Sequence, residues 1–460
     1  MAKMEKPRFF TAMLAGKAVS RLLRLFGKRA THLPGEIALA VCGDFFRQME
    51  KPKTLICVTG TNGKTTTSNL IASLLRGAGY SVTNNSLGSN TAAGIAAALL
   101  QNATLTGRPK NDYAVIEVDE RSSLQFYPFM APDYLVCTNI MPDSIMRNAH
   151  TDFISYIINT AVPSTTKVLL NADDILCAQL ARQCPARIFY GVSAEAPPAP
   201  ADDSLKNLYY CPECGARMKA DYLRYEHIGR VRCTACSFGS PTPDYTVTEI
   251  NRKYGFFTLR HQEQEAHYTI VNDNIVNIYN TSAAVSLFAE MGFPAAKTDS
   301  LLQQAEIVKD RYEQIIAGDL RVTMILAKGL NAVAVGSVFR YVASRPGDNK
   351  CLLLLIDDRE YNDHDSEICC WLYDLDYGPL KDDSIKKIIF AGKRCLDHRL
   401  RTTMSGLDQE KILYRDAVRN SADLVDTTAF HDVYVLYSAY FIKEAMREKD
   451  RLLRKGKNGK

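Results

Sequence analysis

The segment from Val58 to Thr67, VTGTNGKTTT, constrains the fold of this chain more than any other stretch. An apolar run before it reads as a buried strand, and the pattern after it, from Ser68 to Arg76, reads as a helix. Glycines in a turn between a strand and a helix let backbone N–H groups face phosphate oxygens, and the helix N-terminus adds a favourable dipole. The segment therefore predicts a nucleotide phosphate site and not an ordinary turn with a chance lysine. The residues expected to bind the nucleotide, ATP, are Gly60, Thr61, Asn62, Gly63, Lys64, Thr65 and Thr66.

Two side chains of this loop have predicted roles. Lys64 can reach the β- and γ-phosphates, and the Thr65 hydroxyl can hold Mg²⁺. Glu117 lies at the end of an expected strand over residues 113–118, where a carboxylate faces the loop of a parallel sheet. We therefore expect Thr65 and Glu117 to share a magnesium site.

Short apolar runs alternate with helical patterns, which predicts an α/β fold with a parallel, doubly wound sheet in its first part. Strands are expected at 113–118, 134–138 and 167–170, before a proline-rich linker over 193–203. A second, Rossmann-like rhythm follows residue 295, with strands expected at 321–326, 351–356, 388–391 and 432–437. We expect a helical segment over residues 1–50, a central ATP-binding domain over 51–295, a C-terminal domain over 296–445 and a basic tail over 446–460, frayed from residue 449.

Composition narrows the class of protein. The chain has 460 residues, 46% of them hydrophobic, and a net charge of +5 that is too small to indicate nucleic-acid binding. No signal peptide or membrane span is apparent. Of the 13 cysteines, four form two pairs, and the other nine are scattered and sit mostly in apolar contexts, so we expect reduced thiols and a cytoplasmic location. The basic segment from Lys3 to Arg29 could lie as an amphipathic helix on a membrane surface, but a helix packed on the body is favoured. Membrane contact is expected to be peripheral at most.

Two CxxC pairs predict a zinc site. Cys211 with Cys214, and Cys233 with Cys236, have the spacing at which thiolates complete a tetrahedral Zn²⁺ site, and a second matching pair has no redox explanation. His227 lies between the pairs and is expected to be structural or exposed, because the thiolates already fill the shell. We expect zinc to stabilise a ribbon inserted at about 205–243, because this insertion is too small to form a sufficient hydrophobic core of its own. A nucleic-acid-binding ribbon is the alternative, disfavoured because acidic residues dilute its basic ones.

The spacing within the phosphate loop resembles that of one superfamily. Two residues separate Gly60 from Gly63, whereas a common phosphate loop places four between its first glycine and the Gly-Lys pair. The short form is similar to that of the Mur ligases and folylpolyglutamate synthases, in which ATP phosphorylates a carboxylate and an amine displaces the phosphate. The implied fold is a Mur-ligase-like central ATPase domain with an inserted four-cysteine zinc ribbon, followed by a C-terminal Rossmann-like domain. The resemblance also implies nucleotide contacts or metal binding by Glu117, Asn277, Asn280 and Arg311.

A ligase core with a four-cysteine insertion is similar to the MurT family, the synthetase subunits of lipid II isoglutaminyl synthase. Further segments that resemble this family are 31–38, 225–229, 392–397 and 437–440. The resemblance implies ATP-dependent amidation of the D-glutamate α-carboxyl in the lipid II stem peptide to D-isoglutamine, through an acyl phosphate. Ammonia would come from a separate GatD-type glutaminase in a heterodimer. The UDP-sugar domain of standard Mur ligases is expected to be missing.

The family's synthetase subunit also supplies an aspartate to the glutaminase. The corresponding stretch here, from Ile356 to Trp371, is longer and lacks the family's glycine, so Asp363 and Asp365 are both candidate catalytic residues. Asp365 could instead cap a helix through Trp371. Further departures from the family pattern fall at 143–147 and 328–332.

Two other functions stay open at this stage. One is a self-sufficient ligase that joins an amino acid to a carboxylate, which a need for a glutaminase would exclude. The other is a zinc-ribbon ATPase that binds nucleic acid, which salt-sensitive oligonucleotide binding would support.

Overall fold

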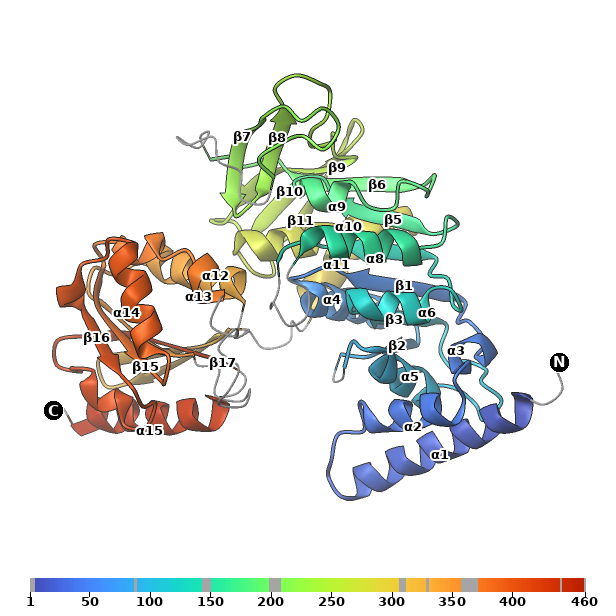
Figure 1. Ribbon diagram of the computed structural model, residues 1–460, viewed down its shortest axis with the longest axis horizontal. Coiled ribbons are helices and arrows are strands. Elements are labelled where there is room, and N and C mark those ends of the chain that lie inside the picture. The colour runs from blue at the N-terminus through green and yellow to red at the C-terminus, as the bar shows by residue number, and fades with distance from the viewer. Residues whose placement is uncertain are drawn as a thin grey trace. The chain divides into compact units, whose positions relative to one another are not determined.

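The computed structural model describes residues 5–86, 89–142, 150–197, 208–305, 312–327, 331–356, 371–438 and 441–458. The chain divides into two compact units (Figure 1). The first comprises residues 1–141 and 151–308, and the second comprises residues 142–150 and 309–460. Each unit is built around a sheet of its own.

Among the described residues, the first unit has a nine-stranded sheet in the order β11-β10-β9-β6-β5-β4-β1-β3-β2. The strands from β2 across to β9 pair in parallel, which confirms the predicted parallel sheet, and β10 and β11 extend it in antiparallel fashion. Because β2 and β3 lie on one side of β1 and β4 to β6 on the other, β1 marks the switch point where such sheets bind ligands. The strands are β1 (Thr54–Thr59), β2 (Val82–Asn84), β3 (Tyr113–Glu117), β4 (Tyr134–Cys137), β5 (Lys167–Asn171), β6 (Arg187–Val192), β9 (Tyr245–Asn251), β10 (Phe256–His261) and β11 (Gln264–Thr269).

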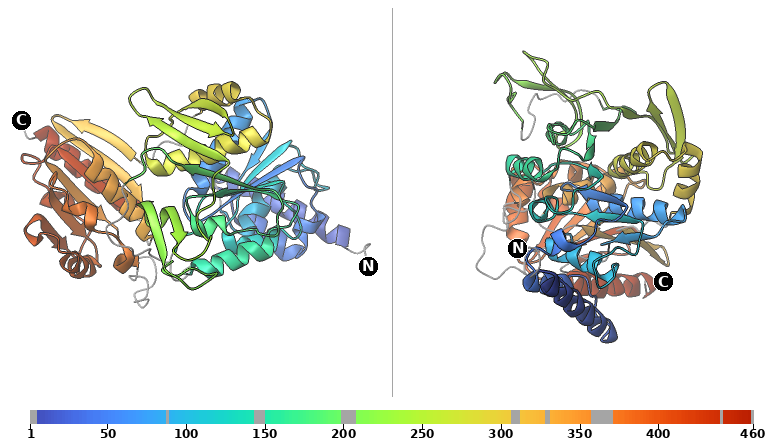
Figure 2. Two further views of the ribbon diagram at one scale, coloured as in Figure 1. Left: turned by 90° about the horizontal axis from the view of Figure 1, so that it is seen from above. Right: turned by 90° about the vertical axis from the view of Figure 1, so that its right-hand side faces the viewer.

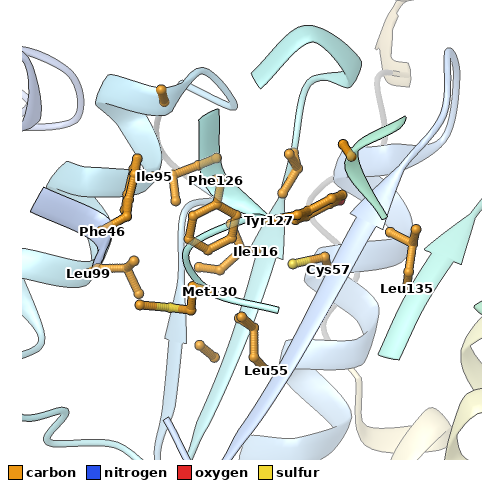
Figure 3. Packing of buried hydrophobic residues seen from close by; sticks show 14 of the residues in the cluster. Phe46, Leu55, Cys57, Ile95, Leu99, Ile116, Phe126, Tyr127, Met130 and Leu135 are labelled. Carbon is orange, nitrogen blue, oxygen red and sulfur yellow. The ribbon is translucent and has the colours of Figure 1, made fainter. Parts of the chain in front are cut away.

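Both faces of this sheet are covered, which is why β1 reads as a continuous apolar run. On one face, Leu55 and Cys57 of β1 and Ile116 of β3 pack in a core with α5 (Ala92–Gln101) and α6 (Ser123–Phe126) (Figure 3). Within that core the rings of Phe46 and Phe126 meet edge to face, with their centroids 5.0 Å apart. The helices α4 (Lys64–Gly77) and α10 (Ile275–Glu290) also contact each other and the sheet. Further helices of the unit are α8 (Thr151–Ala161), α9 (Ile175–Ala178) and α11 (Ala295–Gln304).

An N-terminal helical layer packs on the first unit, as the favoured prediction had it. It consists of α1 (Glu5–Leu25), α2 (Leu33–Val41) and α3 (Phe45–Gln48), and α1 contacts α2, α3 and α5. Figure 2 shows α1, in dark blue, at the outer edge of this unit. A side chain at Gly35 would place its Cβ 2.6 Å from the Ala97 backbone nitrogen, so glycine allows α2 to approach α5 closely.

The cysteine-bearing insertion forms an antiparallel pair, β7 (Met218–Tyr225) and β8 (Ile228–Cys233), between β6 and β9 in the sequence. Its small core joins Met218, Ala220 and Val231 to Ile175 of α9. Most of the predicted proline-rich linker lies outside the described residues.

Within the described part of the second unit, a six-stranded sheet has the order β12-β13-β17-β14-β15-β16. All its pairs are parallel except β12 with β13, which agrees with the Rossmann-like expectation. The strands are β12 (Tyr312–Ala317), β13 (Leu320–Ala327), β14 (Lys350–Leu355), β15 (Ile385–Ala391), β16 (Ile412–Arg415) and β17 (Asp432–Ser438). The helices are α12 (Ala332–Ser344), α13 (Trp371–Asp374), α14 (Cys395–Met404) and α15 (Ile442–Asn458).

The prediction of a frayed C-terminal tail is wrong, because α15 continues to Asn458. Leu452 is buried against the sheet, and the Glu448 carboxylate accepts hydrogen bonds from the backbone N–H groups of Asn420 and Ala422. Further along, the Lys455 ammonium donates to backbone carbonyls of the same segment. These tertiary contacts stabilise a basic helix whose sequence alone suggested fraying.

Candidate functional site

The predicted phosphate loop lies between the end of β1 and the start of α4, at the switch point of the sheet. Gly60 and Gly63 have φ angles of +119° and +86°, which side chains rarely adopt. A Cβ at Gly60 would collide with the Thr138 hydroxyl and lie 2.8 Å from the Asn139 carbonyl oxygen. Both positions therefore require glycine, for conformation and for space.

The segment after β4 holds the loop in place. The Thr61 backbone N–H donates to the Asn139 carbonyl at 2.8 Å, and the Asn62 N–H donates to the Asn139 side-chain oxygen at 3.0 Å. The Thr61 hydroxyl donates to the Met141 carbonyl at 2.9 Å. The Thr-Asn-Ile motif at residues 138–140 thus acts on the phosphate loop, although it lies far from it in the sequence.

Lys64 is buried and paired with an acidic residue whose role the sequence did not indicate. Its Nζ lies 2.9 Å from Glu120 Oε1 and also donates to the Gly60 carbonyl. Burial lowers the pKa of Lys64, but the negative charges of Glu120 and Glu117 outweigh this and raise the pKa above its ordinary value. The ammonium is therefore held charged at the loop. The acidic Glu-Val-Asp-Glu stretch at residues 117–120 was the available signal.

The predicted magnesium ligands lie together. The Thr65 hydroxyl donates to Glu117 Oε2 at 2.7 Å, because Glu117 ends β3 directly beside Val58 of β1. The Asn90 amide donates to the other carboxylate oxygen at 2.9 Å, and Asn85 bonds both backbone groups of Glu117. A hydroxyl and a carboxylate are oxygen ligands that suit Mg²⁺, so the donor set fits this ion. Asn85 and Asn90 were not predicted from the sequence.

One of the two asparagines of α10, Asn280, also reaches this loop. A Cβ at Gly63 would collide with the Asn280 side chain, and the Asn280 amide donates to the Asn277 side-chain oxygen at 3.3 Å. Asn280 is buried, whereas Asn277 is half-buried. The structure thus brings Asn280 to the phosphate loop from more than 200 positions away in the sequence, and Asn277 contacts Asn280.

Several predicted positions lie outside the described residues. They are Arg311, Asp363 and Asp365, together with 143–147 and 328–330.

The thiols of Cys211, Cys214, Cys233 and Cys236 lie together at one end of the β7–β8 pair, all four sulfurs within 4.8 Å of one another. The Cys211–Cys236 and Cys214–Cys233 sulfur distances are 3.6 and 3.4 Å. The Ala235 backbone N–H donates to the Cys233 sulfur at 3.3 Å, a contact that stabilises the thiolate form of a metal ligand. A set of thiols this compact fits a tetrahedral metal site.

His227 is buried and structural. Its Nε2 lies 3.1 Å from Asp174 Oδ1, and the other oxygen of Asp174 accepts from the Ile140 N–H at 2.6 Å. Burial lowers the pKa of His227, but the nearby Asp174 carboxylate raises it by more, so the pKa lies above its ordinary value. Asp174 thereby ties the insertion to the segment that clamps the phosphate loop, a link the sequence did not reveal.

Three arginines of the insertion bond to other groups of the protein. Arg224 donates to the carbonyl oxygens of Val192 and Ala194, and Arg230 donates to that of Pro241. Arg232 pairs with Asp221 at 2.9 Å. These contacts weaken the alternative of a nucleic-acid-binding ribbon, which needs such charges to face phosphates.

Two family models match the chain. The one described as Mur ligase middle domain matches residues 58–218, and the one described as MurT ligase C-terminal matches residues 327–440.

Curated relatives match nearly the whole chain. A lipid II isoglutaminyl synthase (glutamine-hydrolyzing) subunit MurT from Staphylococcus aureus (strain COL) is 29% identical over 92% of this chain and 94% of its own length. The subunit of the same name from Streptococcus pneumoniae is 27% identical over 92% of this chain and 93% of its own length.

Solved structures show the same fold. A pseudomurein peptide ligase type C from Methanothermus fervidus has a TM-score of 0.66, with 18% identity over 89% of this chain and 81% of that one. MurF from Acinetobacter baumannii has a TM-score of 0.63, with 15% identity over 91% of this chain and 80% of that one. At these identities, the likeness concerns the fold.

Proposed function

The chain belongs to the Mur ligase family, and we propose that it is the synthetase subunit of a lipid II isoglutaminyl synthase. The main support for this proposal is that Lys64, Thr65 and Glu117 lie close together at the phosphate loop. They meet in a chain similar to MurT subunits over 92% of its length.

In the first step, an oxygen of the D-glutamate α-carboxylate attacks the γ-phosphorus of ATP, ADP leaves, and an acyl phosphate forms. Negative charge on the transferring group needs fixed positive charge and N–H donors around it. Lys64 and the N-terminus of α4 supply both at the loop. We propose that Arg311 adds a second cation, and that Asn277 and Asn280 contact the nucleotide.

Thr65 and Glu117 are the residues that would hold Mg²⁺, which when bound would neutralise charge on the phosphates. Asn90 keeps the Glu117 carboxylate oriented through its 2.9 Å hydrogen bond. Thr65→Val should therefore raise the Mg²⁺ concentration needed for half-maximal turnover. Thr160→Val, which removes an exposed hydroxyl on α8, is the matched control and should leave this requirement unchanged.

In the second step, ammonia attacks the carbonyl carbon of the acyl phosphate, phosphate leaves, and loss of a proton gives the D-isoglutamine amide. The ammonia would come from a GatD-type glutaminase subunit, to which Asp363 or Asp365 would contribute the aspartate. The matching relatives are themselves named as subunits of a glutamine-hydrolysing synthase, which supports a partner. We further propose a cytoplasmic location and a structural Zn²⁺ ion on the four-cysteine cluster.

The test is phosphate release from ATP by the purified chain, with lipid II and either ammonium or glutamine, with and without a glutaminase subunit. Turnover with ammonium alone, and with glutamine only when the partner is present, is the expected result. Turnover with a free amino acid, but with neither ammonium nor glutamine, would instead identify a self-sufficient ligase.

A further inference from the structure

The outer face of α1 is apolar, although the inner face already packs on the protein. Phe9, Ala12 and Met13 lie in the core of the first unit. The opposite side, together with Phe26 in the turn after the helix, exposes large apolar side chains. We term these the α1 patch: Phe10 (44% exposed), Leu14 (44%), Leu22 (54%), Leu25 (83%) and Phe26 (72%). A helix that covers a globular core normally presents polar residues to water on its outer face.

The α1 patch is held outward by rigid packing. Gly16 lies against the Pro34 carbonyl oxygen, which a Cβ would approach to 2.9 Å. The Lys17 ammonium donates to the Ala103 carbonyl at 2.7 Å, and Arg24 bonds the Gln101 side chain. Because the inner face is anchored in this way, α1 cannot roll to bury the patch against its own unit.

The charged residues in the stretch of chain that carries the α1 patch have one sign. From residue 6 to residue 35 the sequence contains no aspartate or glutamate. Exposed basic residues border the apolar side chains, and they are Arg8, Arg21, Arg24, Lys28 and Arg29. An exposed apolar stripe whose own segment carries only cations is complementary to a surface that is apolar inside and anionic at its rim.

We propose that α1 docks the protein onto an anionic lipid surface, in the plane of the headgroups. The leucine and phenylalanine side chains of the patch would enter the acyl boundary while the basic residues contact lipid phosphates. None of the described helices combines the length and the apolar character that a membrane crossing requires, so this contact would be peripheral. The inference goes beyond the proposed reaction and does not depend on it.

Sedimentation of the full chain with vesicles tests the proposal without any substrate. The protein should pellet with vesicles of mixed phosphatidylglycerol and phosphatidylcholine, much less with phosphatidylcholine alone, and less as salt is added. Leu25→Ser/Phe26→Ser and Lys28→Gln/Arg29→Gln should each weaken binding by about tenfold. The control pair, Phe153→Ser/Tyr254→Ser, removes exposed aromatic groups elsewhere on the first unit and should bind as the parent does.

Circular dichroism melting of each variant separates lost binding from lost folding. Absence of vesicle binding by the parent, or equal binding by the patch variants, would overturn the proposal. Association of the parent into dimers that Leu25→Ser/Phe26→Ser abolishes, without vesicle binding, would show that a second copy covers the patch and would also overturn it.

Discussion

Replacing Lys64 with alanine should destabilise the first unit as well as stop turnover. The Lys64 side chain is 9% exposed and that of Glu120 is 3% exposed, with 2.9 Å between their charged atoms. Removing the ammonium leaves a carboxylate buried without its cation, and breaking such a buried pair costs about 3–5 kcal/mol. We expect a loss of about 3 kcal/mol at pH 7, the lower end of this range.

Removing the other partner should cost less. In Glu120→Gln the charges of Glu117 and Asp119 remain near the Lys64 ammonium, and the new glutamine amide oxygen can still accept a hydrogen bond from it. The double variant removes both buried charges, so it should recover about 1–2 kcal/mol relative to Lys64→Ala.

The chain contains an internal reference for this measurement. Its single tryptophan, Trp371, lies in the second unit, so tryptophan fluorescence follows that unit in urea. Circular dichroism follows both units. Lys64→Ala should shift a circular dichroism transition to lower urea while the Trp371 fluorescence transition stays in place.

Two outcomes would refute the reasoning. One is a loss of less than about 1 kcal/mol in Lys64→Ala, which would mean that water or another cation compensates Glu120. The other is a double variant no more stable than Lys64→Ala, which would show that the cost arises from lost packing and not from an uncompensated charge.

Three further predictions concern the loop, the second unit and the thiols. Gly60→Ala should weaken nucleotide binding at least tenfold in calorimetry, because φ is +119° and the Cβ meets Thr138; an unchanged affinity would contradict the geometry. Burial lowers the pKa of His398 to about 3, so unfolding takes up a proton below pH 6.5. The free energy of unfolding of the second unit should therefore fall by up to about 1.4 kcal/mol per pH unit between pH 6.5 and about pH 3. Trp371 fluorescence measures this loss, and His398→Gln should make the pH dependence weaker. A zinc chelator should lower the melting temperature of the parent protein but not that of Cys214→Ser. Identical melting curves of the parent with and without chelator would exclude a stabilising metal.

Much of the site could be predicted because its signals are local. Gly60, Gly63, Lys64 and Thr65 lie within six positions, and their backbone conformations follow from a strand that runs into a helix. The spacing of the four cysteines predicted a metal site, and the structure brings their sulfurs together. Glu117 was predictable because the carboxyl ends of parallel strands share one edge of the sheet.

Other partners could not be predicted, because they depend on which strands become neighbours. Asn139 clamps the loop only because β4 pairs with β1. Asp174 reaches Ile140 because β5 pairs with β4, and it reaches His227 because the insertion packs on α9. No local pattern encodes contacts over such separations. The same holds for α15, where tertiary hydrogen bonds to Glu448 stabilise a helix expected to fray.

The sequence by itself determined the strand–loop–helix phosphate site, the paired cysteines and the alternation of two α/β regions, because short-range conformational preference and residue spacing encode all three. Only the tertiary structure decided that Lys64 meets Glu120 and that α1 is apolar on both sides. An amphipathic pattern shows that a helix has an apolar side. Which side is buried, and whether a second apolar side remains in water, depends on the surface against which the helix packs.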